Sequence, residues 1–269
     1  MKKTFVSLCI IAGAGLISGT ALAQSAAEEI AKYRAMLADG NPAELVEGQG
    51  EVLWKQARGP SKVSLEKCDF GKGPGVLKGA YAELPRYFKD TDAVMDFESR
   101  LVHCMVTLQG FTREEVIKKP FSGQGERATD LEALTSYAVA ESRGSTINIP
   151  QQHHKEKASF ARGEQAFYYR AGPFDFSCAS CHSTTGQRIR LQDLPNLQDS
   201  LQAQKAFATW PAYRVSQGAV RTMQWRLNDC FRQQRFPDLK YASPTSVDLI
   251  TYLGVMAKAG VMDAPAIKR

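Results

Sequence analysis

The chain has 269 residues, of which 43% are hydrophobic and 23% are charged, and its formal net charge is +6. This length is sufficient for one large domain or two small ones, each with its own core. The positive excess is small and includes no long run of lysine or arginine, so we do not expect nucleic acid as a partner.

The first 23 residues have the pattern of a secretory signal peptide. Lys2 and Lys3 precede an apolar stretch from Phe5 to Ile17, and Ala21-Leu22-Ala23 offers small residues for cleavage. The apolar stretch is shorter than the roughly 20 residues that cross a bilayer, and no later segment is long and uncharged enough to do so. We therefore expect an exported, periplasmic protein without a membrane span.

Residues rich in Gly, Pro and Asn interrupt the chain at 39–50 and again at 143–150, after a polar, helix-prone leader at 25–39. These breaks predict a first domain at 24–148 and a second at 149–269. Patterns typical of strands are scarce, so the fold is expected to be mostly α. Apolar periodicity predicts helices over Thr91–Leu108, Thr129–Ala140, Phe160–Tyr169, Leu197–Ala208, Gln217–Arg235 and Pro244–Lys258.

The two halves carry similar residues at equal spacings. The first half contains Leu84-Pro85-Arg86-Tyr87, Arg100 and Cys104, and the second contains Trp210-Pro211-Ala212-Tyr213, Arg226 and Cys230. In each half the cysteine follows the proline by 19 residues and the arginine by four, and a leucine follows the arginine. The shared offsets favour an old duplication over a chance match.

The second half contains the sequence Cys178-Ala179-Ser180-Cys181-His182. A C-x-x-C-H loop supplies two thiols spaced for the vinyl groups of haem and a histidine that binds the iron. A bare C-x-x-C is also found in redox dithiols and zinc sites, but no second C-x-x-C or H-x-x-x-H accompanies it. The pattern therefore predicts a covalent haem c, attached through Cys178 and Cys181 with His182 as an axial ligand.

The first half has no such loop. At the corresponding place it has Lys67-Cys68-Asp69-Phe70-Gly71, with one cysteine and no histidine. We therefore expect one haem and two cytochrome-c-like domains, the first without haem. The simplest interpretation of Cys68 and Cys104 is a disulfide that braces this first domain, and the alternative is two unpaired buried thiols.

The iron needs a second axial ligand, for which Met223, Met256, Met262 and Cys230 are the candidates. A helix over 217–235 that ends before Pro237 places Arg226 and Cys230 on one face. Basic residues lie nearby, which favours a thiolate with a pKa below the free value of about 8.5 and suits an anionic substrate. These neighbours are Arg221, Arg232, Arg235 and Lys240.

Alternatives to this interpretation remain open at the level of the residues. Arginines along a helix more often form only its solvated face, and Met223 and Trp225 are residue types more often found in the core than as ligands. Cys230 is as compatible with a disulfide to Cys68 or Cys104 as with a role as iron ligand or nucleophile. His103, His153 and His154 have no metal-binding motif around them, so they are expected to serve surface or packing roles.

With these motifs in place, the chain resembles the A subunits of the SoxAX cytochromes of bacterial thiosulfate oxidation over nearly all of its length after the leader. The matching segments are Glu98–Cys104 with Gln109-Gly110-Phe111, the loop Cys178–His182, and Arg226–Cys230 with Arg232, Arg235 and Pro237. Members with two haems have a full C-x-x-C-H at the place of Cys68, so this chain is similar to the one-haem branch.

The resemblance implies a function for these residues. It implies an L-cysteine S-thiosulfotransferase that joins thiosulfate to a cysteine of the SoxYZ carrier and releases two electrons to a c-type cytochrome. Cys230 would be the second axial ligand and carry a persulfide, Arg226 would bind thiosulfate, and a SoxX cytochrome would be the partner subunit. The alternative is an exported electron-transfer cytochrome with no catalysis of its own.

Overall fold

The computed structural model describes residues 32, 36, 40–189 and 192–268. The predicted signal peptide and most of the helix-prone leader lie outside the described residues. The chain from Asn41 onward forms one structural unit. Among the helices of the described residues, none is long and apolar enough to cross a membrane.

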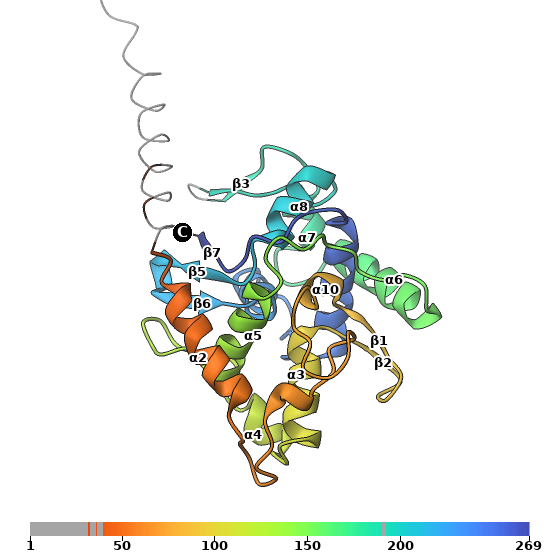
Figure 1. The fold of residues 1–269 in the computed structure, drawn as a ribbon. Coiled ribbons are helices and arrows are strands. Elements are labelled where there is room, and N and C mark those ends of the chain that lie inside the picture. The colour runs from red at the N-terminus through yellow and green to blue at the C-terminus, as the bar shows by residue number, and fades with distance from the viewer. Residues whose placement is uncertain (1–31, 33–35, 37–39, 190–191, 269) are drawn as a thin grey trace, which may run out of the picture. The chain divides into compact units, whose positions relative to one another are not determined.

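Each half is built on a pair of long helices that pack against each other (Figure 1). The pair is α2 (Ala43–Lys55) with α5 (Asp130–Ala140) in the first half, and α6 (His154–Tyr168) with α10 (Pro244–Met256) in the second. A Cβ atom on Gly50 would lie 2.1 Å from the Ala133 carbonyl oxygen, and one on Gly163 would lie 2.0 Å from that of Asp248. The two helix crossings therefore depend on glycine at equivalent positions.

A hairpin followed by a helix also occurs once in each half. The elements are β1 (Arg86–Phe88), β2 (Ala93–Met95) and α3 (Phe97–Thr107), and later β5 (Ala212–Arg214), β6 (Ala219–Arg221) and α9 (Met223–Gln233). A cis proline precedes each hairpin, and the strand registers match, with Arg86 opposite Met95 and Ala212 opposite Arg221. Equivalent residues here differ by 126 in number, as the repeated spacing predicts.

Shorter elements complete the described fold. Strand β7 (Ala266–Lys268) pairs in parallel with β5, and β3 (Arg188–Ile189) pairs with β4 (Gln192–Asp193). The remaining helices are α4 (Arg113–Ile117), α7 (Cys178–His182) and α8 (Ser200–Ala208), with 3-10 turns at Leu65–Lys67, Tyr81–Glu83 and Val215–Gln217.

The expected helices at 129–140 and 244–258 are confirmed to within two residues. The expected starts at Thr91 and Gln217 are wrong, because residues 93–95 and 219–221 are strands. Helices α3 and α9 begin only after Asp96 and Thr222, whose side chains accept hydrogen bonds from the first turn.

Two further boundaries differ from the sequence-based prediction. The expected break at 39–50 is wrong, because α2 begins at Ala43 and runs through Gly48 and Gly50. Helix α6 begins at His154, six residues before the expected start, and His153 caps it in a capping box. Gly50 in α2 therefore marks a close helix contact rather than a loop.

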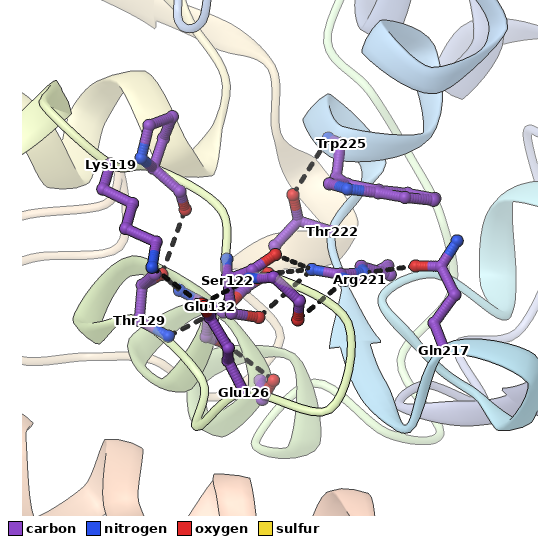
Figure 2. A network of polar contacts seen from close by, with 12 residues as sticks. Lys119, Ser122, Glu126, Thr129, Glu132, Gln217, Arg221, Thr222 and Trp225 are labelled. Carbon is purple, nitrogen blue, oxygen red and sulfur yellow. Dashed lines mark hydrogen bonds and ion pairs between the residues drawn. The ribbon is translucent and has the colours of Figure 1, made fainter. Parts of the chain in front are cut away.

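A buried ion pair joins the two halves (Figure 2). The Nη1 atom of Arg221 lies 3.1 Å from Oε1 of Glu132, and both side chains are at most 3% exposed. The guanidinium also donates to the Ser122 carbonyl and to Gln217, and it lies over the ring of Trp225. Because Arg221 directly precedes the cap of α9, the start of this helix is anchored on the first half.

The N-termini of α3 and α9 also meet across the two halves. Glu98 accepts hydrogen bonds from Thr222 Oγ1 at 3.1 Å and from the Tyr241 hydroxyl at 2.9 Å. Gln224 Nε2 of the second half likewise donates to Asp96 Oδ2 of the first half at 2.8 Å. Burial, together with the charge of Asp96, raises the pKa of Glu98 to about 8.

Candidate functional site

The predicted haem loop forms the short helix α7. Ser177 caps this helix and accepts a hydrogen bond from the Ser180 amide, which fixes the turn that presents Cys178, Cys181 and His182. Both cysteines are unpaired and half-buried. Burial raises the pKa of the Cys178 thiol to about 12. The turn thus offers two adjacent thiols and an imidazole.

The ring of His182 is held in a defined orientation. Its Nδ1 lies 2.8 Å from the Pro195 carbonyl oxygen, and its own carbonyl accepts the Leu197 amide at 2.7 Å. A carbonyl can only accept, so Nδ1 donates and the lone pair lies on Nε2. Burial lowers the pKa of His182, which favours the neutral imidazole that a metal requires.

The structure brings Arg226 and Cys230 to the same site as the haem loop. The two residues lie one turn apart on α9, and the charge of Arg226 acts on both Cys230 and His182. The thiols of Cys178 and Cys230 also lie close enough to interact electrostatically. The haem loop, Arg226 and Cys230 are therefore gathered in one place.

The cysteines of the first half are joined to each other. Cys68 and Cys104 form a disulfide, and Cys230 is unpaired. The alternative in which Cys230 bridges to either of them is therefore not found. Cys104 is the equivalent of Cys230, so one repeat position holds a disulfide in the first half and a thiol in the second.

Asp229 is a site residue that the sequence reasoning missed. It is buried, and its Oδ2 lies 3.2 Å from Arg226 Nη1 while its Oδ1 lies 2.6 Å from Arg232 Nη2. Gln233 Nε2 donates to the same carboxylate at 2.7 Å. The carboxylate fixes the direction of Arg226 and neutralises part of its charge. Its position three residues after one arginine and before another was the available signal.

The expected lowering of the Cys230 pKa is wrong for the polypeptide itself. Burial raises the pKa of this thiol, and the charges of Arg226 and Arg214 reduce that effect without reversing it. Arg221 points to Glu132 in the other half, and Arg232 is paired with Asp229. Counting the basic residues near Cys230 in the sequence thus overestimates the positive charge near its thiol in the structure.

The other candidates occupy structural positions. Met223 and Met262 are buried in the hydrophobic core, and Met256 packs against it. His153 stacks on Tyr87 with ring centroids 3.7 Å apart, as a packing residue would. Within the described residues, no group of three His, Cys, Asp or Glu side chains could hold a metal ion.

The donor set fits a covalently attached haem. Attachment and ligation of haem c use two thiols on one turn and a fixed imidazole whose Nε2 carries the lone pair. The site provides these groups, and a third unpaired thiol lies nearby. An extra zinc-type ligand set is not found in the described part of the chain. The fold and this site together define a protein of the cytochrome c class.

Comparison with known proteins gives the family. The model of the SoxA/TsdA cytochrome c domain matches twice, at residues 49–147 and 162–261. The chain belongs to this family. The mostly α fold with two cytochrome-c-like domains, expected from the sequence, is thereby confirmed.

Individual relatives agree with this assignment. The chain is 46% identical to the L-cysteine S-thiosulfotransferase subunit SoxA of Hydrogenophilus thermoluteolus, with all of both chains covered. It is 30% identical to the subunit of the same name from Hydrogenobacter thermophilus, again over both full lengths. The crystal structure of SoxXA from P. pantotrophus has a similar fold, with a TM-score of 0.70 and 23% identity over 85% of this chain and 79% of that one.

Proposed function

We propose that the chain is the SoxA-type subunit of an L-cysteine S-thiosulfotransferase. In this reaction a carrier cysteine, on SoxYZ, is joined to the terminal sulfur of thiosulfate. A thiolate and a thiosulfate dianion form one sulfur–sulfur bond and give up two electrons, which pass to a c-type cytochrome. Full-length identity of 46% to a subunit with this name supports the proposal, and so does the grouping of Arg226, Cys230 and His182.

The proposal includes one haem c, in a second domain at 149–269, and a first domain at 24–148 without haem. Cys178 and Cys181 would hold the haem, with His182 and Cys230 as the axial ligands. The iron supplies the redox chemistry and favours the thiolate of a coordinating cysteine. Processing of residues 1–23 would place the protein in the periplasm, where a SoxX cytochrome subunit is its partner.

The remaining chemistry belongs to side chains of the chain. Arg226 is only partly buried and offers a guanidinium for the sulfonate oxygens of thiosulfate through charge-assisted hydrogen bonds. Asp229 holds that guanidinium in place at 3.2 Å. The substrate would thus be held beside the sulfur of Cys230. The Cys230 thiolate and the terminal sulfur of thiosulfate would form one sulfur–sulfur bond and give up two electrons. The carrier thiolate would then attack that terminal sulfur and release the Cys230 thiolate.

The decisive variant is Cys230→Ala in the assembled protein with its cytochrome partner and carrier. We expect thiosulfate-dependent cytochrome reduction to fall by at least about a thousandfold, because the variant lacks the reacting sulfur. Haem content should stay at the wild-type level, since Cys178 and Cys181 remain. The measurements are initial rates and the alkaline pyridine spectrum.

Two outcomes would contradict the proposal. Thiosulfate-dependent electron release that survives in Cys230→Ala would reduce the chain to a scaffold for its partner. A near-infrared methionine-to-haem absorption band that persists in the variant would instead assign it to simple electron transfer. Met256→Leu serves as the matched control, since Met256 packs against the core and should leave rate and spectrum unchanged.

A further inference from the structure

Arg214 is the last residue of β5, and it lies beside the proposed site. Its side chain is half-buried, and its Nε is buried without a hydrogen-bond partner in the part of the chain that the structure describes. Its charge interacts with Arg226, Asp229 and Cys230. Burial and the neighbouring Arg226 lower the pKa of Arg214, and the charges of Asp229 and Cys230 act in the other direction without reversing this.

The equivalent position in the first half is Phe88. There the guanidinium of Arg100, the equivalent of Arg226, lies 4.2 Å from the centroid of the Phe88 ring. Its Nη1 donates to Asp90 at 2.7 Å and its Nε to the Asp69 carbonyl at 2.9 Å. In the first half Arg100 is therefore paired with an aromatic ring, a carboxylate and a carbonyl. In the second half the cation Arg214 stands at the position of that ring.

The charges beside Cys230 do not balance within the chain. Asp229 is the acid that pairs with Arg226 and also with Arg232. Both of its oxygens are thus engaged by other arginines, and the Arg214 guanidinium forms no ion pair within the described residues. A partly buried cation without a partner is costly, and an anion that enters the site would relieve that cost.

We propose that Arg214 is a second substrate-binding residue, which holds the sulfonate group of thiosulfate together with Arg226. This inference rests on the proposed function. Two guanidinium groups match a dianion in charge, and the planar donor array of arginine suits paired oxyanion acceptors. The Nε atom, which has no hydrogen-bond partner among the described residues, would donate to a sulfonate oxygen. Carboxylate groups of the haem share the same chemistry, so the experiment must separate the two sources.

The test compares Arg214→Gln, Arg214→Lys and the control Arg127→Gln in the haem-loaded protein with its cytochrome partner and carrier. Arg127 is exposed in the first half, so its replacement removes the same charge away from the site. We expect Arg214→Gln to raise both the KM for thiosulfate and the dissociation constant read from the haem spectrum by about tenfold or more. Arg214→Lys should restore part of the loss, and Arg127→Gln should behave as wild type.

The reduction potential without thiosulfate separates the two anions. An unchanged potential with a raised KM supports the substrate role. A shifted potential with an unchanged KM assigns Arg214 to a haem carboxylate and overturns the inference. An unchanged KM and potential in a variant with wild-type haem content and circular dichroism overturns it too, and leaves the proposed function intact. Absence of thiosulfate turnover in the wild type overturns the function, whereas weaker thiosulfate binding by Arg214→Gln would still support the anion site.

Discussion

The two halves share the same arrangement of hairpin and helix, but the equivalent arginine and cysteine have different partners in each half. In the first half Cys104 is tied to Cys68, and the Arg100 side chain is 6% exposed and paired with Asp90. In the second half Cys230 is unpaired and the Arg226 side chain is 25% exposed. In the first half the paired Arg100 and the disulfide of Cys104 serve a structural role. The same positions become a candidate reactive site once they lack these partners.

The largest expected effect tests whether the disulfide is only a brace. The double variant Cys68→Ala and Cys104→Ala opens a loop with a sequence separation of 36 residues. We expect the free energy of unfolding to fall by about 2–4 kcal/mol, because the unfolded chain gains freedom. Thiosulfate-dependent cytochrome reduction should stay near the wild-type rate under conditions where the variant is folded. Urea unfolding and initial rates measure the two quantities.

The opposite result would break the comparison between the halves. A folded double variant that binds its haem but has lost turnover would mean that the first half takes part in the chemistry.

The next effect tests whether the two helix crossings are equivalent. Gly50→Ala and Gly163→Ala each place a Cβ about 2 Å from a backbone carbonyl of the facing helix, so the helices must separate. Overpacking of this kind should cost about 1–3 kcal/mol in each half. Thermal or urea unfolding of the two variants gives the comparison.

The same helix offers a matched control for these variants. Gly48 also lies in α2, and nothing lies within 4 Å of a Cβ added to it. Gly48→Ala should therefore raise stability by roughly 0.5–1 kcal/mol. Equal gains in stability for Gly48→Ala and Gly50→Ala would show that helix propensity, rather than close packing, governs both positions.

The last expected effect is a dependence of stability on pH, and it uses a difference between Glu98 and its equivalent Gln224. The pKa of Glu98 is about 8 in the folded protein and near 4.5 as a free group. Between these values the folded state binds the extra proton, so the free energy of unfolding falls as pH rises. The slope is at most about 1.4 kcal/mol per pH unit.

The variant Glu98→Gln makes the two halves alike and should flatten this part of the stability curve. Urea midpoints measured from pH 5 to 8 provide the test, with Glu114→Gln, which is exposed on α4, as the control. An identical slope in wild type and Glu98→Gln would place the linked proton elsewhere.

The sequence was informative where the chemistry is local. The C-x-x-C-H loop, the one-turn spacing of Arg226 and Cys230, and the repeated offset from proline to cysteine depend only on neighbours along the chain. Helices with strong caps and apolar faces, such as α5 and α10, were likewise predictable. Local patterns therefore predicted the core of the candidate site.

Features that depend on distant partners were not predictable. Arg221 looked like a site residue, but its partner Glu132 lies 89 positions away in the first half. The role of Arg214 depends on a strand of three residues, which is too short to leave a periodic pattern. Gly50 looked like a loop residue because its purpose is a contact with another helix.

The ion pair between Arg221 and Glu132 has a consequence for any attempt to shorten the protein. A fragment that begins after residue 148 would keep the haem loop and α9, but it would leave the Arg221 guanidinium without the carboxylate and carbonyls that now surround it. Strand β6, which leads into the helix α9 that carries Cys230, would lose its contact with the first half. The second half therefore depends on the first for the position of α9, and with it for the position of Cys230.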